Sequence, residues 1–190
     1  ITIGDWSSDV CSSDLHGSAL YTEEMLSLFD RSGADRLILL GDLLYHGPRN
    51  DLPDGYDPKR VAALLAGRRE KILCVRGNCE AEVDQMMLPF PVMAEYAWFT
   101  EGGRLFFLTH GHRFGPTNRP PLSPGDVLVC GHTHIPAFEE NKDGYYLNPG
   151  SVSIPKDGSV RGAVLLSGDR IAFTDLSGRI WRECTLPPTK

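Results

Sequence analysis

The sequence predicts an α/β fold, a layered α/β/β/α sandwich of two mixed sheets with helices on the outside. In the first half of the 190 residues, helical patterns alternate with short apolar runs, whereas strand-like runs follow one another in the second half. A hydrophobic content of 41% is enough for a full core. No linker separates the two halves, so we expect one domain over residues 1–190.

The first half carries the expected helices. Apolar residues recur at helical spacing near residues 18–31 and 57–69, and residues 80–87 form a shorter helical pattern. Gly33 is a typical stop just past the first helix, and Asp57-Pro58 is a typical start for the second. Residues 36–42 and 71–77 contain short apolar runs, which are typical of buried strands.

Strands are expected throughout the second half. They lie near residues 104–109, 126–130, 145–147, 162–166, 171–173 and 179–184. Turn sequences such as Lys142-Asp143-Gly144 separate these runs. We interpret the apolar residues between Met86 and Trp98 as core, with a protein interface as the alternative.

Composition limits the function. The formal net charge of −6 gives no basic surface for nucleic acid or anionic membranes. No apolar run approaches the ~20 residues that span a bilayer, and no secretory signal is visible. We therefore expect a cytoplasmic protein with reduced thiols at its five cysteines and no nucleic-acid or membrane partner. The sequence leaves homo-oligomerisation open.

Four apolar runs end in a small residue followed by a potential metal ligand. The ligands are Asp42, Asn78, His110, and the pair His132 and His134. Because the carboxyl ends of neighbouring strands meet in one crevice of an α/β sheet, these side chains should converge. Asp14-Leu15-His16-Gly17 would join them if a strand precedes it.

The combined set contains two carboxylates, one amide oxygen and at least four imidazoles. That is too many ligands for one zinc ion and suits two ions that share a bridging carboxylate. Two-metal sites of this kind, with ions about 3.5–4 Å apart, serve in-line displacement at phosphorus.

These motifs carry a family resemblance. D-x-H, G-D, G-N-C-E, T-H-G-H and G-H-T-H, in that order, resemble the calcineurin-like metallophosphoesterases. The match runs from about Leu15 past Lys156. His46-Gly-Pro-Arg-Asn50 after Gly41-Asp42, and the run from Asn148 to Lys156, NPGSVSIPK, resemble the small YfcE-type phosphodiesterases in particular.

The resemblance implies a ligand assignment and a reaction. One ion would be held by Asp14, His16, Asp42 and His134, and the other by Asp42, Asn78, His110 and His132, with Asp42 bridging. A metal-bridging hydroxide would attack the phosphorus of a small phosphate ester. Mn²⁺ is the usual ion of this group, Fe or Zn would also fit, and Mg or Ca would fit poorly.

Three further residues are candidates for catalytic roles. Larger relatives have a histidine, thought to protonate the leaving group, where this chain has Cys79. A neutral thiol is a poor acid, so we expect activity mainly on esters with good leaving groups, or no role for Cys79 beyond packing. His112 either orients a ligand or touches phosphate, and Arg49 either binds a phosphate oxygen or is only solvated. Glu80 should orient a metal ligand.

The N-terminal segment does not read as a core strand. Residues 4–15, GDWSSDVCSSDL, resemble one translated reading frame of a widely used sequencing-library adapter. We therefore interpret residues 1–15 as non-native, with Asp14 completing the D-x-H pattern by coincidence; a serine-rich natural N-terminus is the alternative. An independent read of the 5′ end that recovers the same codons would contradict this interpretation.

The enzyme interpretation, a metal-dependent phosphoric diester hydrolase, has two rivals. The retromer scaffold subunit resembles this fold but binds partners through a degraded metal site, whereas the ligand set here is complete. A nuclease or protein phosphatase could use the same site, but the sequence shows no basic groove for a polymer.

Overall fold

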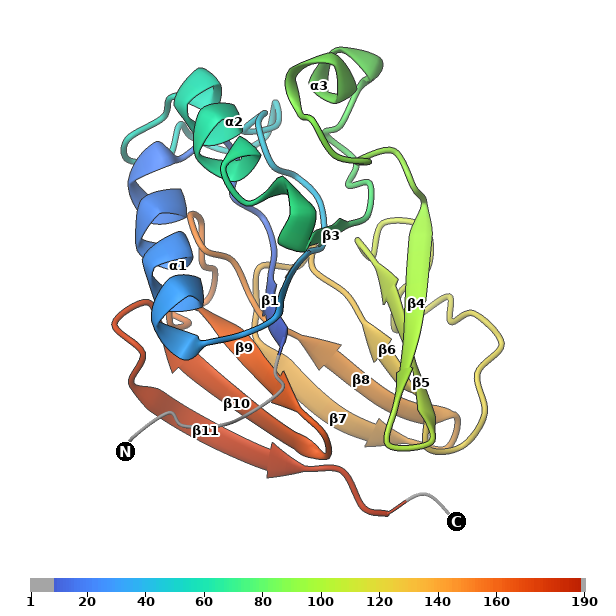
Figure 1. Cartoon of the computed structure of the whole chain (residues 1–190). Helices are drawn as coiled ribbons and strands as arrows, with labels where there is room; N and C mark the ends of the chain where they lie inside the picture. The colour runs from blue at the N-terminus through green and yellow to red at the C-terminus, as the bar shows by residue number, and fades with distance from the viewer. Residues whose placement is uncertain (1–8, 189–190) are drawn as a thin grey trace.

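Two packed β-sheets form the centre of the computed structural model, which describes residues 9–188 (Figure 1). The six-stranded sheet has the order β11-β10-β9-β1-β2-β3, and the five-stranded sheet has the order β4-β5-β6-β8-β7. The first sheet consists of β1 Asp9–Ser12, β2 Arg36–Leu39, β3 Ile72–Cys74, β9 Gly162–Ser167, β10 Arg170–Asp175 and β11 Ile180–Thr185. The second consists of β4 Tyr96–Glu101, β5 Arg104–Thr109, β6 Val127–Val129, β7 Ala137–Asn141 and β8 Gly144–Asn148.

Each sheet combines a parallel group with antiparallel neighbours. β1 pairs in parallel with β2, and β2 with β3. β5, β6 and β8 form the parallel group of the other sheet. The parallel strands of each group therefore deliver their carboxyl ends to one edge, which is where the sequence places its candidate ligands.

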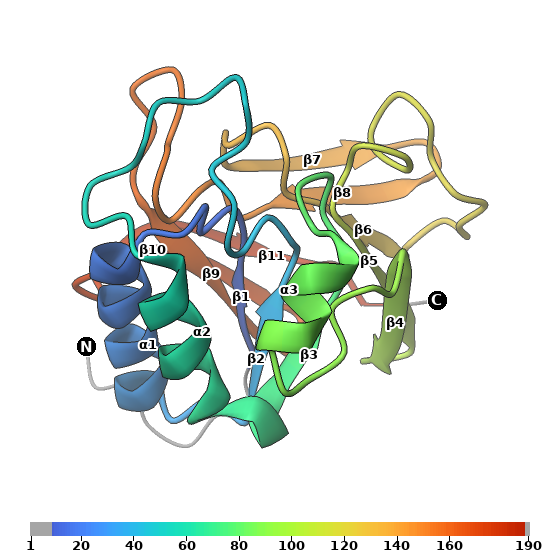
Figure 2. The same cartoon turned by 90° about the horizontal axis from the view of Figure 1, so that it is seen from above.

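Two helices cover the outer face of the six-stranded sheet (Figure 2). α1 spans Ala19–Ser32, with the Ser18 hydroxyl accepting from Tyr21 N and Gly33 in the left-handed conformation at its end. α2 spans Pro58–Ala66 and begins at Asp57, whose side chain accepts from Arg60 N. The shorter helices are a 3-10 turn, Arg69–Lys71, and α3, Glu82–Met87. None of the helices in residues 9–188 is long and apolar enough to cross a membrane.

The core has an inner and an outer part. Side chains from both sheets, including Ile38 and Phe106, form the inner cluster. The outer cluster joins α1 and α2 to the six-stranded sheet through residues such as Phe29 and Leu65. On the outer face of the other sheet, the loop residue Leu122 packs against a small buried cluster. The predicted fold class, a layered α/β sandwich of two mixed sheets, is confirmed, with α1 and α2 on the outer face of the six-stranded sheet.

The interpretation of residues 86–98 as core is correct only in part. Leu88, Phe90 and Val92 are buried, but Met86 is 85% exposed and Trp98 is 59% exposed. The cause is position: Met86 lies on the short helix α3, and Trp98 lies on β4, an edge strand with one open side. The sequence did not predict β4 and β7, the two edges of the five-stranded sheet.

The serine-rich segment forms a central strand despite its composition. β1 lies between β2 and β9, and each of its residues is buried. Val10 joins the outer cluster and Cys11 the inner one, so only two side chains of this strand are apolar. The Ser12 and Ser13 hydroxyls are buried without a hydrogen-bond partner among the described residues. Residues 4–8 of the proposed adapter-derived segment lie outside the described residues.

Replacing Ser12 with alanine should stabilise the protein. The substitution removes a buried hydroxyl that has no partner, and such a group costs about 1–3 kcal/mol. We expect the free energy of unfolding, measured by urea denaturation, to rise by a value in that range. The matched control is Ser32→Ala, because the buried Ser32 hydroxyl donates to Phe29 O and accepts from Ala34 N, so its loss should destabilise. Equal destabilisation by both substitutions would contradict this account.

Candidate functional site

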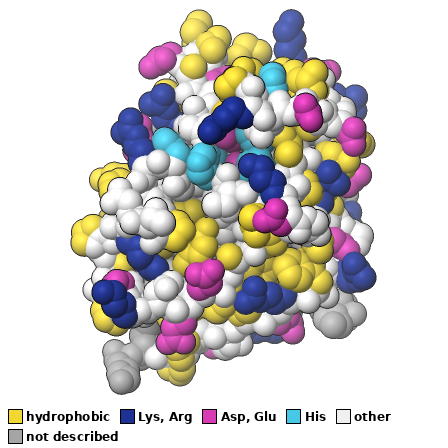
Figure 3. Space-filling view, turned by 180° about the vertical axis from the view of Figure 1, so that it is seen from behind, with side chains coloured by type: hydrophobic (Ala, Val, Ile, Leu, Met, Phe, Trp, Pro, Cys, Tyr) yellow, Lys and Arg dark blue, Asp and Glu magenta, His cyan; other side chains and the backbone are white. Residues whose placement is uncertain are grey.

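Five strands deliver the predicted ligands to one place. Asp14 and His16 follow β1, Asp42 follows β2, and Asn78 follows β3. From the other sheet, His110 follows β5, and His132 and His134 follow β6. Figure 3 shows the histidines gathered on one face, with Lys and Arg side chains beside them. The sequence-predicted ligands of both sheets therefore converge.

The chain turns sharply at these residues. Six non-glycine residues in the described range have a positive φ, and five of them are predicted ligands: Asp14, His16, Asp42, His132 and His134. Aspartate and histidine tolerate this left-handed conformation better than most residues do, but it is still uncommon. Such backbone outliers cluster at functional sites, where the surrounding structure holds them in place.

The first group of ligand atoms surrounds a small space. His16 Nε2 lies 3.2 Å from His134 Nε2. Asp14 Oδ1 lies 3.8 Å from His16 Nε2 and 3.4 Å from His134 Nε2. Asp42 Oδ2 lies 3.8 Å from His16 Nε2. Neighbouring ligands of an ion with bonds of about 2.1 Å lie about 3–3.4 Å apart, so these separations suit one ion.

The second group meets the first at Asp42. Asp42 Oδ2 lies 3.4 Å from His110 Nε2. The same His110 nitrogen lies 3.0 Å from Asn78 Oδ1 and 3.1 Å from His132 Nδ1. Asp42 thus faces both groups, the position that a bridging carboxylate requires.

Three of the histidines are oriented by backbone carbonyls. The Nδ1–H of His16 donates to Tyr45 O, that of His110 to Leu40 O, and that of His134 to Ile154 O, at 2.9, 2.7 and 2.7 Å. Because a carbonyl only accepts, each Nδ1 carries a proton, and the neutral form of each ring offers its Nε2 lone pair to a metal. This is the usual arrangement of metal-binding histidine.

Glu80 holds the turn that carries Asp42. Its buried carboxylate accepts from the backbone N–H of Asp42, Leu43 and Gly77, at 2.9, 2.7 and 2.5 Å. A Cβ at Gly77 would lie 2.1 Å from Asp42 Oδ1, so glycine is required there. The expected role of Glu80 in orienting a ligand agrees with these contacts.

The run from Asn148 to Lys156 supports the other side of the site. The Ser151 and Ser153 hydroxyls both donate to Asp14 O, at 2.9 and 2.8 Å. Ile154 supplies the carbonyl that orients His134. The sequence predicts no role for this run beyond its resemblance to the YfcE-type phosphodiesterases. The run is a motif of small and polar residues. Residue spacing alone does not reveal that its serines contact Asp14.

The charges of the site fit a cation. Burial would raise the pKa of the Asp14 and Asp42 carboxyls, but the facing histidines hold both below their usual values. Burial would likewise lower the pKa of His110, but Asp42 and Asp14 outweigh it and raise that pKa to about 9. Burial and the nearby His110 lower the pKa of His132 to about 4. Two buried carboxylates thus attract positive charge, and divalent ions held by mixed oxygen and imidazole ligands would supply it.

The three catalytic candidates lie at different depths. Cys79 and Arg49 line a cavity of about 490 Å³ that opens over the ligands. The Cys79 thiol donates to Asp42 Oδ2 at 3.3 Å, and burial, with Asp42 next, raises its pKa far above the ordinary value. His112 is not among the residues that line this cavity; its ring lies 5.4 Å from that of His110 and 6.2 Å from that of His132.

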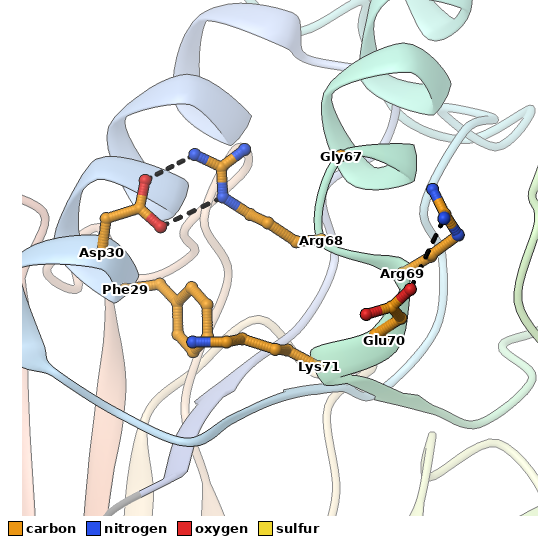
Figure 4. A pocket seen from close by; sticks show the side chains of 7 residues that line it. All are labelled: Phe29, Asp30, Gly67, Arg68, Arg69, Glu70 and Lys71. Carbon is orange, nitrogen blue, oxygen red and sulfur yellow. Dashed lines mark hydrogen bonds and ion pairs between the residues drawn. The ribbon is translucent and has the colours of Figure 1, made fainter.

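A second hollow lies between α1 and the 3-10 turn (Figure 4). Both of its arginines are paired with carboxylates of the hollow itself. Arg68 pairs with Asp30, Arg69 pairs with Glu70 at 3.5 Å, and Lys71 lies 5.6 Å above the Phe29 ring. It therefore has no ligand-binding features comparable with those of the metal-ligand cavity.

Comparisons with known proteins agree with this geometry. Residues 10–170 match the calcineurin-like phosphoesterase superfamily domain. The chain belongs to that superfamily. It is 49% identical to the phosphodiesterase YfcE of Escherichia coli K12 over 165 residues, which cover 87% of this chain and 90% of the relative.

Solved structures show the same fold. That of the Escherichia coli phosphoesterase YfcE aligns with a TM-score of 0.91 at 45% identity, covering 95% of this chain and all of the other. Vacuolar protein sorting 29 of Cryptosporidium parvum aligns with a TM-score of 0.62 at 18% identity, over 95% of this chain and 100% of its own. The second likeness concerns the fold alone.

Glu80→Gln should destabilise the protein. The substitution replaces a charged acceptor of three backbone N–H groups with a neutral amide. The NH₂ group of that amide would face one of these N–H donors. We therefore expect the free energy of unfolding to fall by about 1–3 kcal/mol. Urea denaturation at pH 8 is suitable, because burial and Asp42 raise the pKa of Glu80 to about 7. Glu82→Gln, an exposed control on α3, should change it by less than about 0.5 kcal/mol. Equal small effects would contradict the assigned role.

Proposed function

We propose that this chain is a dinuclear phosphodiesterase that hydrolyses small phosphate esters and is activated by Mn²⁺. Its class, a metal-dependent phosphoric diester hydrolase, is confirmed by the family match and by the 49% identity to a phosphodiesterase. The observation that carries the dinuclear proposal is the position of Asp42, whose Oδ2 faces His16 on one side and His110 on the other.

The proposed ligands divide into two sets that share Asp42. One set is Asp14, His16, Asp42 and His134, and the other is Asp42, Asn78, His110 and His132. One cluster of potential ligand atoms, that of Asp14, His16 and His134, lies wholly within the first set. Asp42 belongs to two further clusters, one with His16 and Cys79 and one with Asp14 and His110. When bound, two divalent ions supply Lewis acidity and lower the pKa of water, which is the chemistry that displacement at phosphorus needs.

The remaining side chains shape the reaction around this centre. Arg49 lies at the cavity wall, where its guanidinium would bind a phosphate oxygen. His112 packs behind His110 and His132 and would position them, without contacting the substrate. Cys79 lies where a leaving group would depart, but its high pKa keeps the proton on sulfur. Esters whose leaving group departs without protonation are therefore the substrates that this site serves best.

The scaffold alternative has less support. The likeness to vacuolar protein sorting 29 at 18% identity carries only the fold. A protein that only binds partners has no need for five strained turns that bring their side chains to one point. Among the described residues, the lining of the cavity contains only two Lys or Arg side chains, Arg49 and Lys156, which favours a small ester over a nucleic acid.

Asp42→Asn should abolish Mn²⁺-dependent hydrolysis of bis-p-nitrophenyl phosphate. Loss of a group that only supports a metal ligand costs about 10–100-fold, so loss of the bridging carboxylate should lower kcat/KM by more than about 100-fold. Asp51→Asn, an exposed aspartate in the loop after β2, is the control and should retain full activity. Retained activity in Asp42→Asn would rule out the shared carboxylate, and a wild-type protein that is folded but inactive with Mn²⁺ would rule out the enzyme.

A further inference from the structure

Lys156 and Arg49 line the cavity that opens over the proposed metal ligands, and they come from different parts of the chain. Arg49 belongs to the loop after β2, whereas Lys156 ends the run that follows β8. Both side chains line the same cavity of about 490 Å³. Among the described residues, neither has an ion-pair partner, in contrast to the paired arginines of the hollow near α1.

The backbone around Lys156 is tied directly to a ligand. Lys156 N donates to His134 O at 3.3 Å, and Ser159 N donates to Lys156 O at 2.9 Å. In return, His134 Nδ1 donates to Ile154 O. The loop of Lys156 thus shares its hydrogen bonds with the turn of His134, which fixes the backbone from which the exposed lysine side chain extends.

The cavity carries more positive charge than one phosphodiester can match. Asp42 is the carboxylate in its lining, and the buried carboxylates of Asp14 and Glu80 lie close to the same centre. Two divalent ions would outweigh these three, and Arg49 and Lys156 add two more positive charges. A phosphodiester brings a single negative charge, so it would leave these cations largely unmatched.

The lining also limits how a substrate is recognised. It contains no Phe, Tyr or Trp, so it offers no aromatic surface for stacking a base. Its volume lies within the range of about 300–1,000 Å³ that is typical of small-molecule sites, which leaves room beyond a single phosphate. Recognition must therefore depend on charge.

We propose that Lys156 binds a second phosphate group of the substrate while Arg49 binds the phosphate that is cleaved, so that the preferred substrates are phosphodiesters carrying an additional phosphate. This inference rests on the proposed phosphodiesterase function. Lys156 would act as a specificity-determining residue and contact the second phosphate as a point charge, without taking part in the displacement.

Two nucleotide esters that differ by one phosphate test the proposal. They are thymidine 5′-(p-nitrophenyl phosphate) and the same ester with a 3′-phosphate, which share the leaving group. With Mn²⁺ present, the wild-type protein should hydrolyse the 3′-phosphorylated ester with a kcat/KM about tenfold higher, the effect of one charge-assisted hydrogen bond. Lys156→Met should remove most of that preference and change kcat/KM for the simpler ester by less than about twofold, and Lys156→Arg should restore part of it.

The matched control is Lys142→Met, an exposed lysine in the turn between β7 and β8, which should keep the full preference. Titration calorimetry with thymidine 3′,5′-bisphosphate measures the dissociation constant without turnover. Lys156→Met should raise this dissociation constant about tenfold, and Lys142→Met should leave it unchanged. Equal rates on both esters, or unchanged binding in Lys156→Met, would overturn the role of Lys156. A wild-type protein inactive on both esters would instead overturn the phosphodiesterase, and the calorimetry would still decide whether Lys156 binds phosphate.

Discussion

The left-handed turns after the parallel strands are the constraint on which the rest of the site depends. Such a conformation costs roughly 1–2 kcal/mol for an ordinary L-residue, so it persists only where other contacts hold it. Here the turns hold one another: His16 N donates to Asp42 O at 2.8 Å, and Asp14 N donates to Gly41 O at 3.2 Å. The first two strands of the parallel group therefore fix each other's ligands.

The same contacts join the two sheets. His110 Nδ1, from the five-stranded sheet, donates to Leu40 O of the six-stranded sheet. His132 N, after β6 of the five-stranded sheet, likewise donates to Asp14 Oδ2, after β1 of the six-stranded sheet, at 3.1 Å. A change in the packing of the sheets would thus move both proposed metal positions at once. Since placement must hold to within about 0.5 Å for function, the inner core serves the site as well as stability.

The sequence predicted the convergence of the candidate ligands, because a strand end followed by a small residue and a polar side chain is a local pattern. The sequence predicted the structure less well where the local residue pattern and the tertiary surroundings favour different conformations. The segment DVCS has poor strand character, yet it occupies the middle of a sheet because β2 and β9 supply its hydrogen-bonding partners. The edge strand β4 was not predicted, because its apolar residues resemble a buried stretch in the sequence. In the structure the Trp98 side chain is exposed. The supporting roles of Ser151 and Ser153 depend on contacts with Asp14 O, about 140 residues away in sequence, and no spacing rule reveals them.

The most direct test of this account is the number of metal ions that the folded protein binds. The purified chain would be stripped with a chelator, saturated with Mn²⁺, desalted and measured by elemental analysis, with folding checked by circular dichroism. Two ions per chain are predicted, because Asp42 lies between the two proposed sets of ligands. A well-folded chain that retains no Mn²⁺ would contradict the dinuclear centre and favour a scaffold, and a single ion would contradict the shared role of Asp42.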